Sequence, residues 1–286
     1  MLIANPLYDV VFKYMMEDNK VAKKFISAII GEQVKELRFA PQEYVVQLPL
    51  RQQTSTVCRM DFVARVQTTA GEYRSVMIEV QKANLSTDVV RFRQYLGKQY
   101  QNIENTYVDE RNNLHAMQIY CIFVLGDGLK IPDVPVLEVT PEVKDRVTGK
   151  PLSSIKTAFI KSLHHRSWIV QVPELPARRR DDVERMLSIF DQSNRTTRYI
   201  LNIREEEVPA QYRDIVRRLQ QAVSTPDMQA NMEAEDFLLE AFRIQERQAQ
   251  MQLEEAKKAI EEKDKALEES RKIIEDLERR LKEKNL

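Results

Sequence analysis

Two acidic residues stand inside stretches that otherwise have the character of apolar strands. Asp61 interrupts residues 57–67, and Glu79 interrupts residues 73–81. A carboxylate in such a strand is costly to bury unless an opposite charge, a proton or a bound cation compensates it. The two acids therefore indicate either an ion pair within the fold or a site that holds something positively charged.

The apolar pattern predicts how these two strands pair. In a hairpin whose loop is centred on Ala70, one face carries only apolar pairs. Asp61 then lies directly opposite Glu79 on the other face, where the Cβ atoms of paired residues are about 4.5–5.5 Å apart. The apolar face consists of the pairs Met60–Val80, Phe62–Ile78 and Ala64–Val76.

This acidic pair has two interpretations. Carboxylates at that separation share a proton or hold a cation, and Mg²⁺ takes oxygen ligands from one or two carboxylates together with waters. Arg59 and Arg65, on the same face, offer a structural ion pair instead. Because side chains alternate along a strand, Gln81 and not Lys82 points the same way as Glu79.

Helices on either side of a small mixed sheet are predicted to carry this hairpin, which makes the chain an α/β protein. Asn5 is predicted to be an N-cap, with Pro6 at the first position of a helix over residues 6–16. A second helix, residues 20–30, ends at Gly31. The remaining predicted elements are strands at residues 43–50, at 117–126 and once or twice within 155–172, a helix of about 20 residues from Ser86, and mostly helical structure over residues 180–225.

The C-terminal segment has no Gly after Gly149 and no Pro after Pro226, so residues 227–286 predict one long helix. An apolar residue recurs there at every seventh position, which is typical of a coiled coil and favours association with a second copy or a partner. Glu–Lys pairs four residues apart support the alternative, an exposed single helix. The predicted domains are therefore residues 1–225 and 226–286. The apolar row is Leu253, Ile260, Leu267, Ile274 and Leu281.

Composition limits the partners and the compartment. Of the 286 residues, 43% are hydrophobic, which is enough for a substantial core. The 44 basic and 44 acidic residues cancel, so a nucleic acid would need a local basic surface rather than overall charge. Two cysteines, Cys58 and Cys121, fit buried, reduced thiols. With no apolar run of about 18 residues and no signal-like start, we expect a cytoplasmic protein without a membrane span.

The order of these segments resembles the PD-(D/E)XK nuclease superfamily. An Asp at one strand and a Glu-X-Gln on the next are similar to the superfamily signature. The opening segment NPLYDVVFKYMM resembles the Asp-X-X-Phe-Lys start of its transposase-like, recombination-promoting nucleases, and RFRQYLGKQY resembles a later helix of that family. The likeness covers residues 5–125 and extends loosely to 225. The matching residues are Asp9, Phe12, Lys13, Asp61, Glu79, Val80, Gln81, Arg91 and Tyr95.

The resemblance implies a restriction-endonuclease-like fold and Mg²⁺-dependent cleavage of DNA phosphodiester bonds, with Mn²⁺ as a substitute. Asp61, Glu79 and the carbonyl of Val80 would bind the metal, which lowers the pKa of a bound water. Gln81 would orient that water, and Asp9 would reach the site from the N-terminal helix. The alternative for Asp9 is a first-turn acid that stabilises the helix dipole.

Two residues depart from the superfamily pattern. Gln81 stands where the signature has a Lys, so no ammonium charge assists there, and Met60 stands where it has a Pro. The alternative function is therefore a catalytically degenerate nuclease fold that acts as an interaction module through its coiled-coil helix.

The helix from Ser86 supplies candidate DNA contacts. Its apolar residues recur at spacings of three and four and predict a buried stripe, with Arg91, Tyr95 and Lys98 on another face. These three residues and Lys13 are predicted to contact DNA, and an ordinary solvated face is the alternative. The predicted stripe is Val89, Phe92, Leu96, Tyr100, Ile103 and Tyr107.

Overall fold

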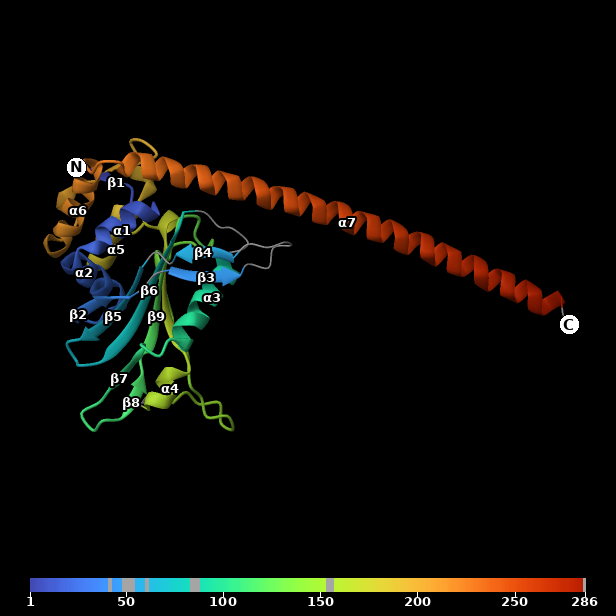
Figure 1. Cartoon of the computed structure of the whole chain (residues 1–286), viewed down its shortest axis with the longest axis horizontal. Helices are drawn as coiled ribbons and strands as arrows, with labels where there is room; N and C mark the ends of the chain where they lie inside the picture. The colour runs from blue at the N-terminus through green and yellow to red at the C-terminus, as the bar shows by residue number, and fades with distance from the viewer. Residues whose placement is uncertain (41–42, 48–54, 60–61, 83–87, 153–156, 285–286) are drawn as a thin grey trace. The chain divides into compact units, whose positions relative to one another are not determined.

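The computed structural model describes residues 1–40, 43–47, 55–59, 62–82, 88–152 and 157–284 (Figure 1). The chain divides into two compact units, Met1–Glu233 and Ala234–Leu286. The first contains a mixed sheet with helices, and the second is the greater part of one long helix. The predicted α/β class is confirmed, and the division falls a few residues beyond the predicted one.

A six-stranded sheet forms the centre of the first unit, in the order β10–β11–β9–β6–β5–β2. The pairs β6–β9 and β9–β11 are parallel, and the others are antiparallel. The carboxyl ends of β6, β9 and β11 therefore share one edge of the sheet. The strands are β2 (Val34–Phe39), β5 (Phe62–Thr68), β6 (Tyr73–Gln81), β9 (Gln118–Leu125), β10 (Val136–Val139) and β11 (His165–Gln171).

The hairpin of β5 and β6 has the predicted register over all of its described pairs. The acidic pair Asp61–Glu79 would lie one position beyond the first of them, but Asp61 is outside the described residues. The alternation of the strand nevertheless assigns Glu79 to the same face as Met77. The pairs on the predicted register include Phe62–Ile78, Val63–Met77 and Ala64–Val76.

The strand predicted over residues 57–67 is divided between two sheets. β4, Ser55–Arg59, pairs with β3, Glu43–Gln47, in a separate two-stranded sheet. β5 begins only at Phe62 and belongs to the large sheet. The predicted strand at residues 43–50 is confirmed over its described part.

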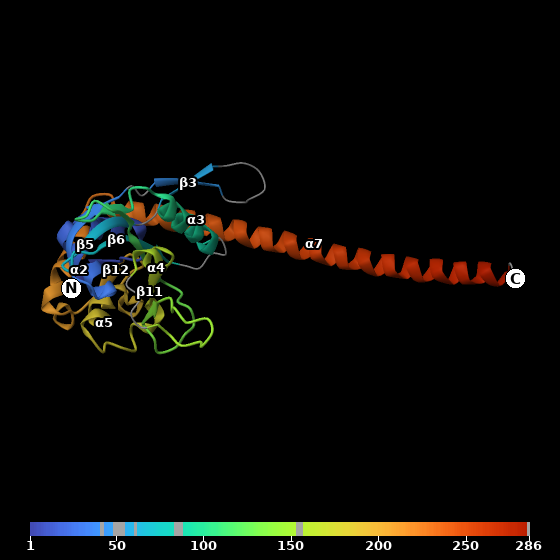
Figure 2. The same ribbon diagram turned by 90° about the horizontal axis from the view of Figure 1, so that it is seen from below.

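Helices cover both faces of the sheet (Figure 2). On one face, α1, α2 and α6 enclose the larger core, in which Phe12, Phe25 and Phe190 pack ring against ring. On the other face, α3 covers a smaller cluster that includes Met77 and Cys121. The helices are α1 (Asp9–Glu17), α2 (Asn19–Ile30), α3 (Asp88–Gln101) and α6 (Arg213–Val223).

The buried face of α3 differs from the predicted stripe. Tyr95 and Gln99 are each only 1% exposed, whereas Tyr100 is 44% and Ile103 is 79% exposed. α3 ends at Gln101, so Ile103 lies beyond the helix. Gln99 can be buried because its carbonyl and its side-chain oxygen accept hydrogen bonds from Asn105 at 2.9 and 2.8 Å. The apolar pattern predicted that Tyr100 would be buried, because it does not record the hydrogen bonds that allow Gln99 to be buried instead.

The predicted N-cap at Asn5 is wrong. α1 begins at Asp9, and its N-cap is Tyr8, which makes no capping bond with its side chain. The Asn5 carboxamide accepts from the N–H of Leu7 at 3.1 Å and donates to Gln192 at 2.9 Å. Asn5 therefore anchors the N-terminal segment to a distant part of the chain. The end of α2 at Gly31 is confirmed, with φ at 69°.

Two predicted segments contain unexpected elements. A short helix, α4, precedes β11 where strands were predicted, and a strand, β12, interrupts the segment predicted as helical. β12 pairs with β1 at the opposite end of the chain. Such short elements depend on distant partners, which a local pattern does not contain. The bounds are β1 (Leu2–Ala4), β7 (Thr106–Val108), β8 (Leu114–Ala116), α4 (Ala158–Ser162), α5 (Asp182–Leu187) and β12 (Ile200–Asn202).

A cation–aromatic cluster lies on the large sheet. Arg74 and Arg166 lie 5.1 and 5.3 Å from the ring centre of Tyr120. The Tyr120 ring lies 5.0 Å from that of Trp168, which is 4% exposed. Burial acts to lower the pKa of Arg74, but Tyr120 and Glu32 outweigh it, and the pKa is raised. Arg74 is therefore a permanently charged part of the core, and the half-buried Arg166 borders it.

The C-terminal segment is the predicted long helix. α7 runs for 57 residues, Met228–Lys284, and Met228 and Met232 at its start are buried in the core of the first unit. No helix within the described ranges is sufficiently long and apolar to cross a membrane. The apolar row is half-exposed, at 56% for Leu253, 59% for Ile260, 56% for Leu267 and 54% for Ile274.

Candidate active site

Glu79 is a buried carboxylate on the central strand β6. Its residue is 5% exposed, on the face that α3 covers. Its neighbour on β9 is Phe123, whose ring meets that of Phe92 from α3 at 4.3 Å. In such apolar surroundings an ionised carboxylate is costly unless a polar partner or a cation lies close by. The position is the predicted one, near the carboxyl end of β6.

The end of β6 is fixed by a close backbone approach. The carbonyl of Gln81 accepts a hydrogen bond of 2.7 Å from the N–H of Gly126. A Cβ atom on Gly126 would lie 2.4 Å from the carbonyl oxygen of Lys82, so only glycine fits. Gln81 is half-buried and follows Glu79 on the same face, as predicted. Val80 packs against the larger core on the other face.

Helix α1 begins close to this end of β6. The ammonium group of Lys82 lies 3.5 Å from the ring centre of Tyr8, the residue before Asp9. Asp9 and Lys13 form an ion pair of 2.6 Å within the helix. The helix packs on the face opposite to Glu79. Asp9 therefore lies near the carboxyl end of β6, but on the face of the sheet opposite to Glu79.

Lys13 lines a small cavity beside the first residue of β5. The cavity measures about 180 Å³ and is lined by Lys13, Glu17, Phe39 and Phe62. Phe62 directly follows Asp61 in the chain. Lys13 is therefore near the first residue of β5, on the face of the sheet opposite to Glu79.

The described donors near β6 suit a hard cation. Within the described residues, no group of three or more His, Cys, Asp or Glu could hold a metal ion. Asp61, the expected third ligand, lies outside them. The donors that remain, the Glu79 carboxylate and the Val80 carbonyl, are oxygens, which Mg²⁺ prefers. Burial raises the pKa of the Cys121 thiol on the same face to about 12.

Arg65 has a partner other than the predicted acids. Its guanidinium pairs with Glu104 and donates to the side-chain oxygen of Asn105 at 3.4 Å. It lies opposite Ser75, four residues before Glu79 on β6. Arg65 therefore does not neutralise Glu79, so the predicted alternative of an ion pair between Glu79 and Arg65 is wrong. The side chain of Arg59 lies outside the described residues.

The three candidate DNA contacts on α3 have three different outcomes in the structure. Lys98 is exposed, as predicted. Tyr95 is buried beside Met77, so its predicted position on a solvated face is wrong. A spacing of three from Phe92 was the signal for its burial, since residues 92, 95, 96 and 99 also form one helix face. Arg91 belongs to α3, but its side chain lies outside the described residues.

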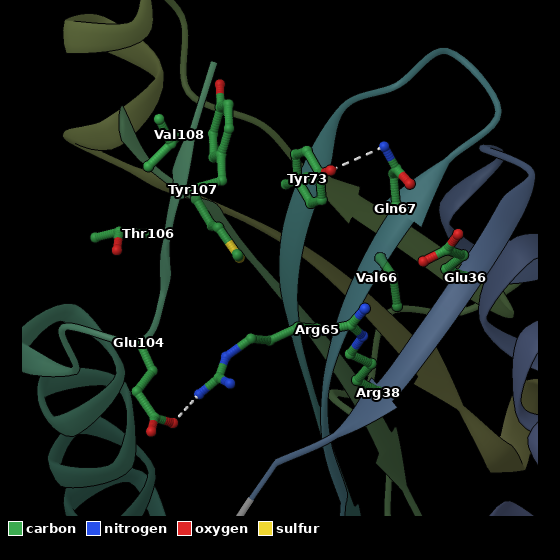
Figure 3. A pocket seen from close by; sticks show the side chains of 11 residues that line it. Glu36, Arg38, Arg65, Val66, Gln67, Tyr73, Glu104, Thr106, Tyr107 and Val108 are labelled. Carbon is green, nitrogen blue, oxygen red and sulfur yellow. Dashed lines mark hydrogen bonds and ion pairs between the residues drawn. The ribbon is translucent and has the colours of Figure 1, made fainter. Parts of the chain in front are cut away.

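A second cavity, which the sequence did not indicate, lies on the α3 face of β2, β5 and β6 (Figure 3). It has a volume of about 330 Å³. Two arginines and two tyrosines contribute to its lining: Arg38, Arg65, Tyr73 and Tyr107. The sequence did not indicate this cavity, because its lining residues are far apart in the chain and meet only through the long-range pairing of β2 with β5.

Comparison of the chain with models of known protein families, with curated proteins and with solved structures found no match. The resemblance to PD-(D/E)XK nucleases stays a prediction from the sequence.

Proposed function

We propose that this protein is a metal-dependent DNA endonuclease of the PD-(D/E)XK type, related to the transposase-associated, recombination-promoting nucleases. The observation that supports this most is the buried carboxylate of Glu79 on a central strand, in the register that would pair it with Asp61. A restriction-endonuclease-like arrangement is consistent with a mixed sheet that has helices on both faces.

In this proposal Asp61, Glu79 and the carbonyl of Val80 hold Mg²⁺. When bound, the metal supplies Lewis acidity and a water of lowered pKa. The Gln81 carboxamide, on the same face as Glu79, orients that water through a hydrogen bond from its oxygen or its amide hydrogens. Because Gln81 is neutral, the electrostatic stabilisation of the phosphate depends on the carboxylate-bound metal.

DNA binding and self-association complete the proposal. Lys13, Arg91 and Lys98 contact phosphates, and Tyr95 supports α3 from within the core. The exposed apolar row of α7 pairs with a second copy of the chain. We also propose that the protein acts in the cytoplasm.

Cleavage of a supercoiled plasmid tests the nuclease. We expect wild type to nick or linearise the plasmid only with Mg²⁺ or Mn²⁺, and Glu79→Gln and Asp61→Asn to lose at least about a hundred-fold in rate, since each removes a metal ligand. The exposed Glu142→Gln variant is the matched control and should cleave as wild type does. Circular dichroism checks that each variant is folded.

A catalytically degenerate nuclease fold is the second candidate, and Gln81 at the signature Lys position favours it. It predicts an intact plasmid with every divalent metal. It also predicts that Mg²⁺ leaves the melting temperature of the protein unchanged, whereas a metal that binds the folded state would raise it.

A further inference from the structure

The 330 Å³ cavity has the size of a small-ligand site. Its floor is the α3 face of β2, β5 and β6, and its other wall is the segment from Glu104 to Val108 (Figure 3). Tyr73 on the floor is six residues before Glu79 on β6 and shares its face. The cavity is therefore about 13–20 Å along the strand from that carboxylate, since Arg65 in its lining lies opposite Ser75.

Two arginines lie next to each other on the floor. Arg38 and Arg65 are direct cross-strand partners on β2 and β5. Like charges in this position repel and need a compensating anion. Arg65 has Glu104, which extends from the opposite wall (Figure 3). No carboxylate among the described residues is within ion-pair distance of Arg38. Arg38 is exposed, and its charge is available to a bound anion.

An ordered stack of rings forms an aromatic wall. Tyr73 and Tyr107 are stacked with ring centres 4.9 Å apart, and His115 stacks on Tyr107 at 5.3 Å. Gln67 donates to the hydroxyl of Tyr73 at 3.0 Å, and Asp109 holds His115 at 2.9 Å. The rings are therefore positioned before any ligand arrives, which lowers the entropy cost of binding.

We propose that this cavity binds an unpaired nucleotide of a DNA strand, with the phosphate on Arg38 and the base against the ring of Tyr73, which Tyr107 supports from its other face. Guanidinium groups bind phosphate through paired hydrogen bonds, and a base packs well on an aromatic side chain. Glu36 and Gln67, also cross-strand partners in the lining, accept hydrogen bonds from an amino group of the base.

The base must be unpaired because a duplex base pair does not fit this site. In a duplex, both faces of each base are covered by its neighbours, so an aromatic wall meets only a base that has left the stack. The inference rests on the proposed function in one respect, namely that the bound strand is the substrate. The distance to Glu79 makes this nucleotide a flanking one, away from the bond that is cleaved.

Fluorescence anisotropy with a short, fluorescein-labelled single strand of DNA tests the site, with the same sequence as a duplex for comparison. The titrations are made in EDTA at several salt concentrations, so that cleavage does not occur. We expect wild type to bind the single strand more tightly than the duplex. The exposed Glu142→Gln variant, which lies outside the cavity lining, should bind as wild type does.

Two variants divide the phosphate and base contacts. Arg38→Gln should weaken binding and reduce the slope of log K against log salt by about 0.7, the value for one phosphate contact on a single strand. Tyr107→Leu should weaken binding about five-fold or more and leave that slope unchanged. Lys35→Gln is the matched control, since Lys35 is an exposed cation on the same strand that does not line the cavity.

Single-strand binding that Arg38→Gln and Tyr107→Leu do not change would overturn the inference, as would tighter binding of the duplex. Because Arg38 is exposed, its variant is expected to fold even if Tyr107→Leu does not. If plasmid cleavage fails but the two variants weaken binding as expected, the proposed nuclease falls and the nucleotide site stands. The reverse result removes only the nucleotide site.

Discussion

At the end of β9, the absence of one methyl group decides how closely two chain segments approach. The Cβ of a residue other than glycine at position 126 would lie 2.4 Å from the oxygen and 2.9 Å from the carbon of the Lys82 carbonyl. Both are backbone atoms, so they cannot turn aside as a side chain would. Gly126 therefore holds the end of β6 and, with it, the orientation of Glu79 and Gln81.

We predict that Gly126→Ala lowers the free energy of unfolding by about 1–3 kcal/mol, because the backbone must shift to admit the methyl group. Urea denaturation measures it, and the cleavage rate should fall as well, since Gln81 moves with the strand. Gly97→Ala is the control: no atom lies within 4 Å of its added Cβ, and alanine favours helix there by about 1 kcal/mol. Equal stability of Gly126→Ala and wild type would contradict the assignment.

At the scale of elements, the sequence predicted what depends on a regular period. The β5–β6 register followed from an apolar face with a period of two, and the exposed length of α7 followed from the absence of Pro and Gly. The phase of α3 was missed, because the burial of Gln99 depends on a hydrogen bond with Asn105, which the apolar pattern does not contain. The strand positions of Glu79 and Gln81 were predicted, and their part in a metal site stays a prediction. The second cavity needs the pairing of β2 with β5, which no local pattern contains.

A loop at the carboxyl edge of the sheet depends on one buried amide at the end of β11. Gln171 is fully buried. Its side-chain oxygen accepts from the N–H of Leu129 at 2.7 Å, and its amide nitrogen donates to the carbonyls of Ile131 and Val134 at 2.9 and 2.7 Å. No apolar side chain of similar size replaces these bonds.

We predict that Gln171→Leu destabilises the first unit by roughly 1–3 kcal/mol for each backbone group left without a partner. The amide proton of Leu129 should then exchange with solvent faster than in wild type, which hydrogen exchange measures. Gln101→Leu, at the exposed end of α3, is the matched control and should change neither quantity appreciably. Unchanged protection of Leu129 in Gln171→Leu would show that other contacts hold the loop.

At the scale of the whole molecule, α7 combines a seven-residue apolar row with ion pairs of its own. Lys265 pairs with Glu261 at 2.9 Å, and Lys272 with Glu268 at 3.6 Å. Each exposed pair of this kind contributes only about 0.3–0.5 kcal/mol. The half-exposed row is therefore the feature of α7 that has most to gain from a partner, and a second copy would present the same row.

Sedimentation velocity tests this self-association. We predict that the full chain sediments as an oligomer, and that Ile260→Glu combined with Leu267→Glu converts it to a single chain, because each substitution would bury a charge in the seam. The exposed Glu262→Lys variant changes a charge on another face of the helix and should keep the oligomer. A wild-type chain that sediments alone would favour the single solvated helix.

The one tryptophan of the chain, Trp168, lies in the cluster with Tyr120 and Arg166, inside the first unit. The second unit contains none. The emission of this indole therefore reports the melting of the sheet alone, whereas far-ultraviolet dichroism also records the 57 residues of α7. Two spectra of one unmodified sample therefore distinguish the unfolding of the first unit from the fraying of α7.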